Sequence, residues 1–503
     1  MRKKPKILEN GGLCIGICFL FLVAATYVHQ RPWHCPTPLS RLDLLHALAT
    51  GKVNIDAYQE NTPDKAEQEG HYYSDKAPGT VALALPAFAV AAGFLSVVGI
   101  LLDSKTGWLF SSWVACAGCI GVIAALGGGT LFAWLSKQVP AKYALITTLA
   151  LFLGAAPLPY ATMMFSHALV VGLLAIALWT IWRQTEQPVN VASPVFLESQ
   201  PSAPLQPLST PHWERKASEK SARCSFPFRN RWDLLAGHVC GWALASEYTA
   251  GIVVIGIFVW LMSTDWRRAI PFCIAAVPPL LLIPAYSWLC FGQPFILPYS
   301  LQASFPPMKE GLYAIKWPSA ETAFNLIFSP TRGLFFWTPF LLMAGVGYWK
   351  LATNSPRLFW LTYAVPLVQI IVISGRTWDW QAGPTLGPRF LAPILPLLAL
   401  PCALGVQRLP KLGILLAGYS IAITTLATLT NACPQGAIYN PLTELHIPLF
   451  LKGEFSPNLG MALGLPPFAS LALYYAILIG GIWWLWKRLP SEITVRDTTN
   501  SSR

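Results

Sequence analysis

The chain has 503 residues, of which 54% are hydrophobic and 12% are charged, and its mean hydropathy is +0.49. Too few polar side chains remain to cover a water-soluble globular domain, so that class is excluded. The apolar runs do not alternate with polar residues, which excludes a membrane β-barrel. We therefore predict an all-α polytopic membrane protein, because several runs reach the roughly 20 residues that a helix needs to cross a bilayer.

The formal net charge of +12 does not indicate nucleic-acid binding, because the lysines and arginines are spread along the chain instead of gathering on one domain. Membrane proteins concentrate these residues on the cytoplasmic side. If every basic cluster is cytoplasmic, the chain has about twelve transmembrane helices, at residues 12–30, 108–134, 142–159, 162–182, 233–247, 249–263, 269–290, 334–350, 357–375, 389–406, 412–430 and 465–486.

Two apolar runs near the N-terminus have alternative interpretations. The basic start MRKKPK with the run from Leu13 to Val28 resembles a signal sequence, although the many spans that follow favour an uncleaved first helix. If every basic cluster is cytoplasmic, the run from Val81 to Leu102 cannot be a further transmembrane helix, because an extra span would reverse the orientation of the basic segments that follow. We interpret it as an interfacial or re-entrant helix in the first outer loop; the alternative is that it spans and a weaker run does not.

A segment rich in Pro, Ser and charge, residues 183–231, predicts a flexible cytoplasmic linker. It separates an N-terminal membrane module, residues 1–182, from a C-terminal module, residues 232–488, which is followed by a tail at 489–503. We expect a plasma (inner) membrane protein with both termini in the cytoplasm.

The chain has 11 cysteines, and most of them lie inside apolar segments. The Cys116 and Cys119 pair falls within an expected span, so small-residue packing explains it better than a metal or redox site. Only Cys35 and Cys433 fall in segments expected outside. A disulfide between these two is one possibility.

Four segments expected on the outer face, residues 31–79, 291–332, 375–389 and 431–464, are richer in polar and aromatic residues than a connection requires. In the first, Asp43, Asp56 and Asp64 are among the carboxylates that could act as a general base, or simply be solvated. Lys76, in the turn SDKAPG just before an apolar run, is expected near the headgroup plane, where it can pair with a lipid phosphate.

Three other charged residues stand beside expected spans. Arg332, in SPTRGLFFW, and Arg389, in GPRFLAPILP, each precede an apolar helix on the outer face, which predicts a phosphate contact or, alternatively, a snorkelling arginine. Glu247, in LASEYTAG, lies at a depth where an ionisable group usually faces a cavity or a partner. The sequence has no HExxH motif, Walker loop or clustered His/Cys set, so no metal ligand is assigned; a divalent cation is left open.

The order of these features resembles the C-type (GT-C) integral-membrane glycosyltransferases, the group of protein O-mannosyltransferases and lipid A aminoarabinose transferases. The resemblance rests on the basic first helix, the acidic outer loop, the turn YYSDKAPG, the apolar helix after it, GHVCGWALASEYTAGIVV and GPRFLAPILP. It implies an enzyme that moves a sugar from a polyprenyl-phosphate donor to an acceptor on the outer face, inverting the anomeric carbon.

The family places its catalytic aspartate soon after the first helix, where this chain reads HCPTPLSRLDLL and has no acid before Asp43. The resemblance therefore implies a base chosen among three residues, in the order Asp56, Asp64 and Asp43. The implied donor-phosphate contacts are Lys76, Arg332 and Arg389. The implied substrate contacts are His71, Tyr72, Tyr73, Glu247, Trp378 and Asp379.

The implied partners are a lipid-linked sugar donor, membrane lipids and a glycan, lipid or protein acceptor. Two other functions stay open. A transporter or flippase of a lipid-linked glycan would need polar residues along a path through the spans, whereas the spans are nearly free of charge. A non-catalytic membrane scaffold would need no site at all. The concentration of polarity in the outer segments favours the enzyme.

Overall fold

A computed structural model describes residues 6–31, 33, 35–183, 231–309, 314–436 and 438–490, with side chains from residue 11 onward. The expected linker at 183–231 lies outside the described residues except for its two ends. The expected tail at 489–503 lies outside them after residue 490, and the basic start lies outside them before Lys6.

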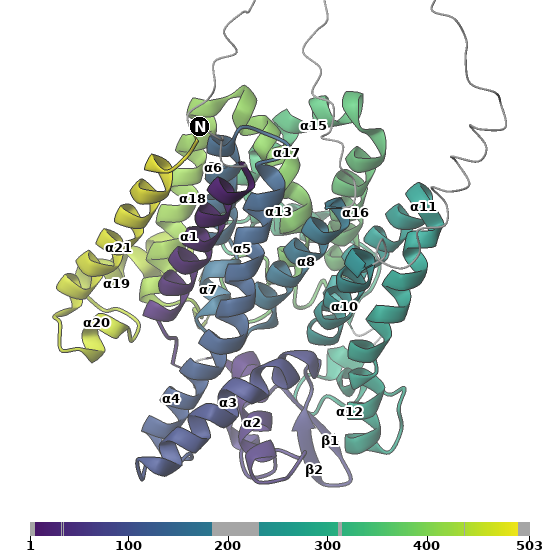
Figure 1. Cartoon of the computed structure of the whole chain (residues 1–503). Coiled ribbons are helices and arrows are strands. Elements are labelled where there is room, and N and C mark those ends of the chain that lie inside the picture. Colours follow the sequence, from purple (N-terminus) through teal and green to yellow (C-terminus); the bar gives the residue numbers. More distant parts are fainter. Residues whose placement is uncertain are drawn as a thin grey trace, which may run out of the picture.

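The predicted helical fold is confirmed, because most described residues form a bundle of long helices (Figure 1). The bundle consists of α1 (Lys6–Tyr27), α4 (Lys105–Ala115), α5 (Val122–Leu135), α6 (Ala141–Leu153), α8 (Ser166–Trp182), α10 (Arg231–Ser246), α11 (Gly251–Leu280), α12 (Leu282–Phe291), α15 (Met343–Asn354), α16 (Pro356–Ser374), α17 (Leu395–Arg408), α18 (Pro410–Thr430) and α21 (Pro467–Lys487). Further helices connect these or cover one end of the bundle: α2 (Pro36–Ala49), α3 (Gly79–Val97), α7 (Pro157–Ala161), α13 (Ala320–Phe328), α14 (Leu334–Trp337), α19 (Ile447–Lys452) and α20 (Leu459–Ala462).

Seven helical stretches are long and apolar enough to cross a membrane, within the part of the chain that the structure describes. They are Gly79–Val97, Lys105–Leu135, Tyr248–Phe291, Pro356–Ser374, Arg389–Arg408, Pro410–Thr430 and Pro467–Lys487, and three shorter apolar helices accompany them. The chain is thus an integral membrane protein, while the number of twelve spans stays a prediction. The two spans expected at 249–263 and 269–290 belong to one helical stretch with a kink at Asp265, whose backbone is extended (φ −158°, ψ 99°).

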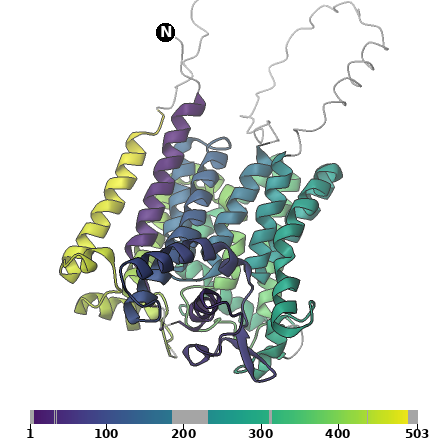
Figure 2. The ribbon, with the colours of Figure 1, turned by 60° about the horizontal axis from the view of Figure 1, so that its bottom comes forward.

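The segment between α1 and α4 covers one end of the bundle (Figure 2). There α3 lies across the end of the bundle (Figure 1), in keeping with the interfacial interpretation, although it is long enough to span. Gly79 begins this helix against the backbone of Ala245 at the end of α10, where a Cβ atom would not fit.

A two-stranded hairpin was not foreseen in the all-α prediction. Strands β1 (Lys65–Gln68) and β2 (His71–Ser74) pair antiparallel with Lys65 opposite Ser74. The turn between them consists of Glu69 and Gly70, both with positive φ (54° and 79°), which is the geometry that suits a tight two-residue hairpin. The charged run that sequence analysis treated as a loop is therefore an ordered sheet edge.

A disulfide joins Cys35, just before α2, to Cys433, with a Cα–Cα distance of 6.0 Å. This confirms the pairing that sequence analysis left as a possibility, and it ties the first outer segment to the segment 431–464. Cys116 and Cys119 are buried as free thiols in a π-helical turn, Cys116–Gly121, between α4 and α5, as their position in an apolar segment predicted.

Helices α15 and α17 approach each other through glycines on both sides. A Cβ atom on Gly405 would collide with the backbone carbonyl of Met343, and one on Gly347 would collide with that of Pro401. Small residues allow this close approach of backbones in a membrane bundle, where van der Waals packing provides much of the stability. This packing holds α17 against α15, and the helical turn Arg389–Ile394 leads directly into α17.

We expect Gly405→Val to lower the thermal midpoint of unfolding in detergent by several degrees, because the added side chain forces the two backbones apart at a cost of about 1–3 kcal/mol. Gly418→Val is the matched control, since a Cβ atom at Gly418, on α18, meets no neighbouring atom within 4 Å. Equal midpoints for the two variants would show that the contact between α15 and α17 is not tightly packed.

Candidate active site

A cavity of about 370 Å³ opens at the end of the bundle that carries α2 and the hairpin. Three of the four polar segments picked out in the sequence contribute to it, together with the ends of α8 and α10. The polar and aromatic lining residues are Thr37, Asp64, Asp75, Lys76, His167, Glu247, Tyr248, Thr249, Tyr299, Gln302, Phe305, Arg376, Trp378, Asp379, Arg389 and Phe390.

Lys76 stands between two carboxylates in this cavity. Its Nζ lies 2.9 Å from Oδ2 of Asp64 and 3.0 Å from Oδ1 of Asp75. Thr37, on α2, donates a hydrogen bond to the same Oδ2 of Asp64 (2.6 Å), and Gln302 donates one to Asp75 (2.9 Å). Both contacts of Asp64 fall on Oδ2, so among the described residues Oδ1 has no hydrogen-bond partner.

The electrostatics of this trio follow from burial and proximity. Burial raises the pKa of Asp64, but the adjacent Lys76 ammonium and the hydrogen bonds from Thr37 and Lys76 outweigh it and hold that pKa below its usual value. Burial and the neighbouring Asp64 raise the pKa of Asp75. Burial acts to lower the pKa of Lys76, but the two carboxylates raise it overall. Asp64 is therefore ionised and Lys76 is charged at neutral pH.

Arg389 is the cation of the cavity that lacks a carboxylate partner among the described residues. Its guanidinium lies 5.1 Å from the ring centre of Phe165 and 5.1 Å from that of Phe390, and it donates to Thr37 Oγ1 (3.3 Å). Its Nε is buried without a hydrogen-bond partner. Arg376, by contrast, pairs with Asp379 at 3.1 Å. A guanidinium held between two rings and unmatched by a carboxylate suits an anionic ligand.

Glu247 reaches the cavity from the turn after α10. It accepts a hydrogen bond from Ser166 (2.7 Å), which in turn accepts one from the buried Arg41 (3.1 Å). His167 Nδ1 lies 3.8 Å from the same carboxylate oxygen. Glu247 is therefore positioned from behind by α2 and α8, so its carboxylate belongs to the polar framework of the cavity wall.

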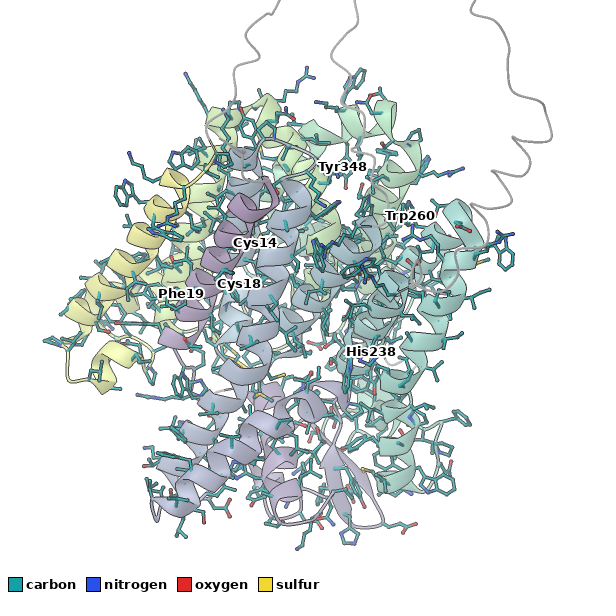
Figure 3. All side chains as sticks on the ribbon, in the orientation of Figure 1. Cys14, Cys18, Phe19, His238, Trp260 and Tyr348 are labelled. Carbon is teal, nitrogen blue, oxygen red and sulfur yellow. A yellow bond between two sulfur atoms is a disulfide. The ribbon has the colours of Figure 1, made fainter. Side chains whose placement is uncertain are left out.

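A second, apolar cavity of about 590 Å³ adjoins the first. It runs between α11 and α16 and is lined by Ile252, Ile255, Gly256, Val259, Trp260, Ser263, Arg357, Trp360, Leu361, Ala364, Val365 and Val368. Ile252 lines both cavities, and Trp260 lies toward the other end of the bundle (Figure 3). The charged cavity and the apolar groove along these two membrane helices thus share Ile252 in their walls.

Six of the twelve residues expected in the site line the charged cavity: Asp64, Lys76, Glu247, Trp378, Asp379 and Arg389. The other six do not. Arg332 is buried beside the cavity, where its guanidinium donates to the carbonyls of Thr331 (2.8 Å) and Gly383 (3.4 Å). Tyr72 and Tyr73 belong to β2 of the hairpin, where Tyr72 lies under Lys65 and Tyr73 packs against Phe291.

Asp56, the first choice as base, lies on the surface of the hairpin. It accepts hydrogen bonds from the backbone N–H of Tyr72 (2.7 Å) and contacts His71 Nδ1 (2.7 Å), so both it and His71 stabilise the loop away from the cavity. Asp43 is buried on α2 and accepts a hydrogen bond from Asn61 (2.9 Å); burial raises its pKa to about 8. Neither carboxylate lines the cavity.

Several cavity residues had no signal of their own in the sequence. Asp75 is one of seven acidic residues in the segment 31–79, and Thr37, Gln302 and Arg376 lie in polar outer segments without a motif that singles them out. The adjacency of Asp75 and Lys76 before a Pro-Gly turn was the one clue available.

As for metals, no group of three or more His, Cys, Asp or Glu side chains forms a ligand set among the described residues.

We expect Lys76→Met to destabilise the protein by about 3–5 kcal/mol, because it leaves two carboxylates buried without their cation. Burial would then raise the pKa of Asp64 above its unfolded value, so the remaining stability should be highest near pH 4 and fall as pH rises through the folded pKa. In the parent, the lowered pKa of Asp64 contributes stability that is lost only at acid pH, whereas the raised pKa values of Asp75 and Asp43 reduce stability as pH rises. The thermal midpoint of Lys76→Met relative to the parent should therefore fall further as pH rises from 4 to 8. Thermal midpoints over that range test this, with the exposed Lys52→Met as control; a midpoint difference between variant and parent that does not change with pH would contradict it.

Comparison with known proteins gives matches among solved structures alone. No family model matches the chain, and no curated protein matches it. The matches include the crystal structure of ArnT from Cupriavidus metallidurans bound to undecaprenyl phosphate (15% identity, 96% of this chain and 76% of that chain, TM-score 0.44) and the same protein in the apo state (14% identity, 96% and 74%, TM-score 0.44). These are structures of the aminoarabinose transferase group that the sequence resembles.

Proposed function

We propose that the protein is a membrane glycosyltransferase that moves a sugar from a polyprenyl-phosphate donor to an acceptor. The observation that carries this proposal is the junction at Ile252, where a cavity lined by charged side chains meets an apolar groove between α11 and α16. An amphiphile with an anionic head and a long hydrocarbon tail is the ligand class that matches both parts. A lipid-linked sugar phosphate is such a molecule.

Arg389 is the proposed contact for the donor phosphate. The other two cavity cations already have carboxylate partners, Lys76 with Asp64 and Asp75, and Arg376 with Asp379. A guanidinium can bind two phosphate oxygens at once, and a fixed positive charge stabilises the negative charge that builds on a departing phosphate. Lys76 lies in the same cavity and adds to this field.

Asp64 is the proposed base. Its Oδ2 is held by Thr37 and Lys76, whereas Oδ1 has no partner in the described part of the chain. A carboxylate that is ionised at neutral pH can orient an acceptor hydroxyl or amine and take its proton as the bond to the anomeric carbon forms. The carbon–oxygen bond to phosphate breaks on the opposite side, so the configuration inverts.

The exposed position of Trp378 on the cavity wall suits a contact with the sugar, since its indole offers an apolar face beside the polar groups. Asp379 and Glu247 offer acceptors for sugar hydroxyls.

We further propose that the cavity faces the extracytoplasmic side. The Cys35–Cys433 disulfide lies beside it, with Cys433 at the Pro384 carbonyl (2.9 Å), a residue of the cavity wall. Disulfides persist in oxidising compartments and are rare in the cytosol. The basic turns at the opposite end, such as the one with Arg408 and Lys411, support the same orientation.

The donor site is tested with undecaprenyl phosphate as the probe and purified protein in nanodiscs. We expect Arg389→Ala to weaken binding at least tenfold. Arg389→Lys should have an intermediate effect, because an ammonium keeps the positive charge but cannot make the bidentate contact of a guanidinium. Lys452→Ala, an exposed cation on α19, should bind like the parent. Native mass spectrometry gives the affinities; unchanged binding by Arg389→Ala would rule out the assigned phosphate contact.

The base is tested by transfer from polyprenyl-phosphate sugars. Asp64→Asn should lower kcat about 100-fold or more, whereas Asp56→Asn should keep most of the activity because Asp56 lies outside the cavity. The reverse pattern would instead support the base that the sequence ranked first. Movement of labelled lipid across vesicles without formation of a glycosylated product would favour the flippase.

The orientation is tested with cysteines introduced at exposed positions at the two ends. Glu67→Cys, on β1, should react with a membrane-impermeant maleimide in intact cells, and Lys411→Cys, at the start of α18, should react only after the membrane is opened. The opposite labelling pattern would place the cavity in the cytoplasm.

A further inference from the structure

A third cavity, of about 520 Å³, adjoins the charged one across α2 and the segment 59–64. Leu39 and Asn61 line the third cavity, while Thr37 and Asp64, close to them in the chain, line the charged one. Its lining consists of Trp33, Leu39, Ala57, Tyr58, Asn61, Asp103, Lys105 and Trp108. None of these residues takes part in the proposed donor site.

Aromatic rings form much of this lining. Tyr58 and Trp108 meet edge to face with their centres 5.8 Å apart, and Trp33 is 40% exposed. The buried ring of His46 stacks on Trp108 with centres 3.7 Å apart and an interplanar angle of 9°. Trp108 is therefore held in a fixed position, which lowers the entropy lost when a ligand packs on it.

A fixed carboxylate stands among these rings. Asp103 Oδ1 accepts a hydrogen bond from the Tyr58 hydroxyl (3.0 Å) and contacts Nδ1 of His46 (3.1 Å). The Asp103 side chain is nevertheless 62% exposed, so its second oxygen is open to a ligand. Lys105 also lines the cavity, with Nζ 5.6 Å from the centre of the Trp33 ring.

We propose that this cavity binds a sugar unit of a glycan acceptor. A sugar ring has an apolar C–H face that packs on aromatic rings and hydroxyls that donate to a carboxylate, and aromatic walls with a few fixed polar groups suit such a ligand. The Asp103 and Lys105 charges balance, so the cavity has no excess positive charge to attract an anionic lipid headgroup, which favours an uncharged glycan over such a lipid.

The position of the cavity gives it a place in the reaction. The two hollows are separated by α2, and a helix is about 10 Å across, so an acceptor of a few sugar units could occupy this cavity and still present a hydroxyl to Asp64. The identification of the glycan as an acceptor rests on the proposed transferase function. The binding of a glycan in this cavity does not depend on that function.

The test measures glycan binding without any donor. Fluorescently labelled protein in nanodiscs is applied to an array of defined gluco-, manno-, galacto- and N-acetylglucosamine oligosaccharides of two to six units, and hits are titrated calorimetrically. We expect Trp33→Ala and Asp103→Asn each to weaken binding at least tenfold. Trp317→Ala, a 91% exposed tryptophan outside all three cavities, is the matched control and should bind like the parent.

Three outcomes would overturn the proposal. The parent could bind no saccharide on the array, or Trp33→Ala and Asp103→Asn could bind saccharides as well as Trp317→Ala does. In the third outcome, Trp33→Ala and Asp103→Asn lose binding to phosphatidylglycerol vesicles but not to saccharides. Arg389→Ala separates the two proposals, because it should lose undecaprenyl phosphate but keep the glycan. If it loses neither, the donor assignment fails while the glycan site stands; if the parent transfers sugar yet binds no array glycan, the transferase stands and the glycan site fails.

Discussion

The ammonium of Lys76 between Asp64 and Asp75 is the interaction on which the rest of the site depends. Asp64 immediately precedes β1 and Lys76 closely follows β2, so their contact closes the base of the hairpin. Thr37 attaches the trio to α2, and Gln302 attaches it to a segment more than 200 residues later. A buried charge is stable only when it is paired and hydrogen-bonded, so these contacts must form together. The hairpin and α2 are thereby held at the cavity wall.

Once the trio is formed, the charge of the cavity is divided unevenly. Lys76 and Arg376 are paired with carboxylates, whereas Arg389, within the part of the chain that the structure describes, contacts two aromatic rings and Thr37 but forms no ion pair. An anion can therefore bind Arg389 without first displacing a carboxylate from it. The apolar groove that begins at Ile252 has no such charge until Arg357. The charged cavity therefore suits the anionic head of an amphiphilic molecule, and the apolar groove suits its hydrocarbon tail.

The same first outer segment also explains why its acidic residues differ in role. Asp56 is used to hold the hairpin through Tyr72 and His71, Asp43 is buried with Asn61, and Asp64 alone of the three faces the cavity. A carboxylate that already stabilises a turn has its lone pairs occupied by local donors. Spacing along the chain cannot distinguish these cases, because all three lie within a stretch of 22 residues whose folding is decided by contacts with distant segments.

By itself, the sequence determined that the chain is a helical membrane protein, where its longest helices lie, and that polarity gathers in a few segments, since these follow from hydropathy and from the cost of unpaired backbone groups in lipid. It also placed Lys76, Arg389 and Glu247 beside apolar helices, because charges there stand out. Only the tertiary structure decided which acids face the cavity, that Cys35 meets Cys433, and that Asp75 shares Lys76 with Asp64. Those choices depend on which surfaces α2 and the hairpin bury, a long-range result of packing that no local pattern records.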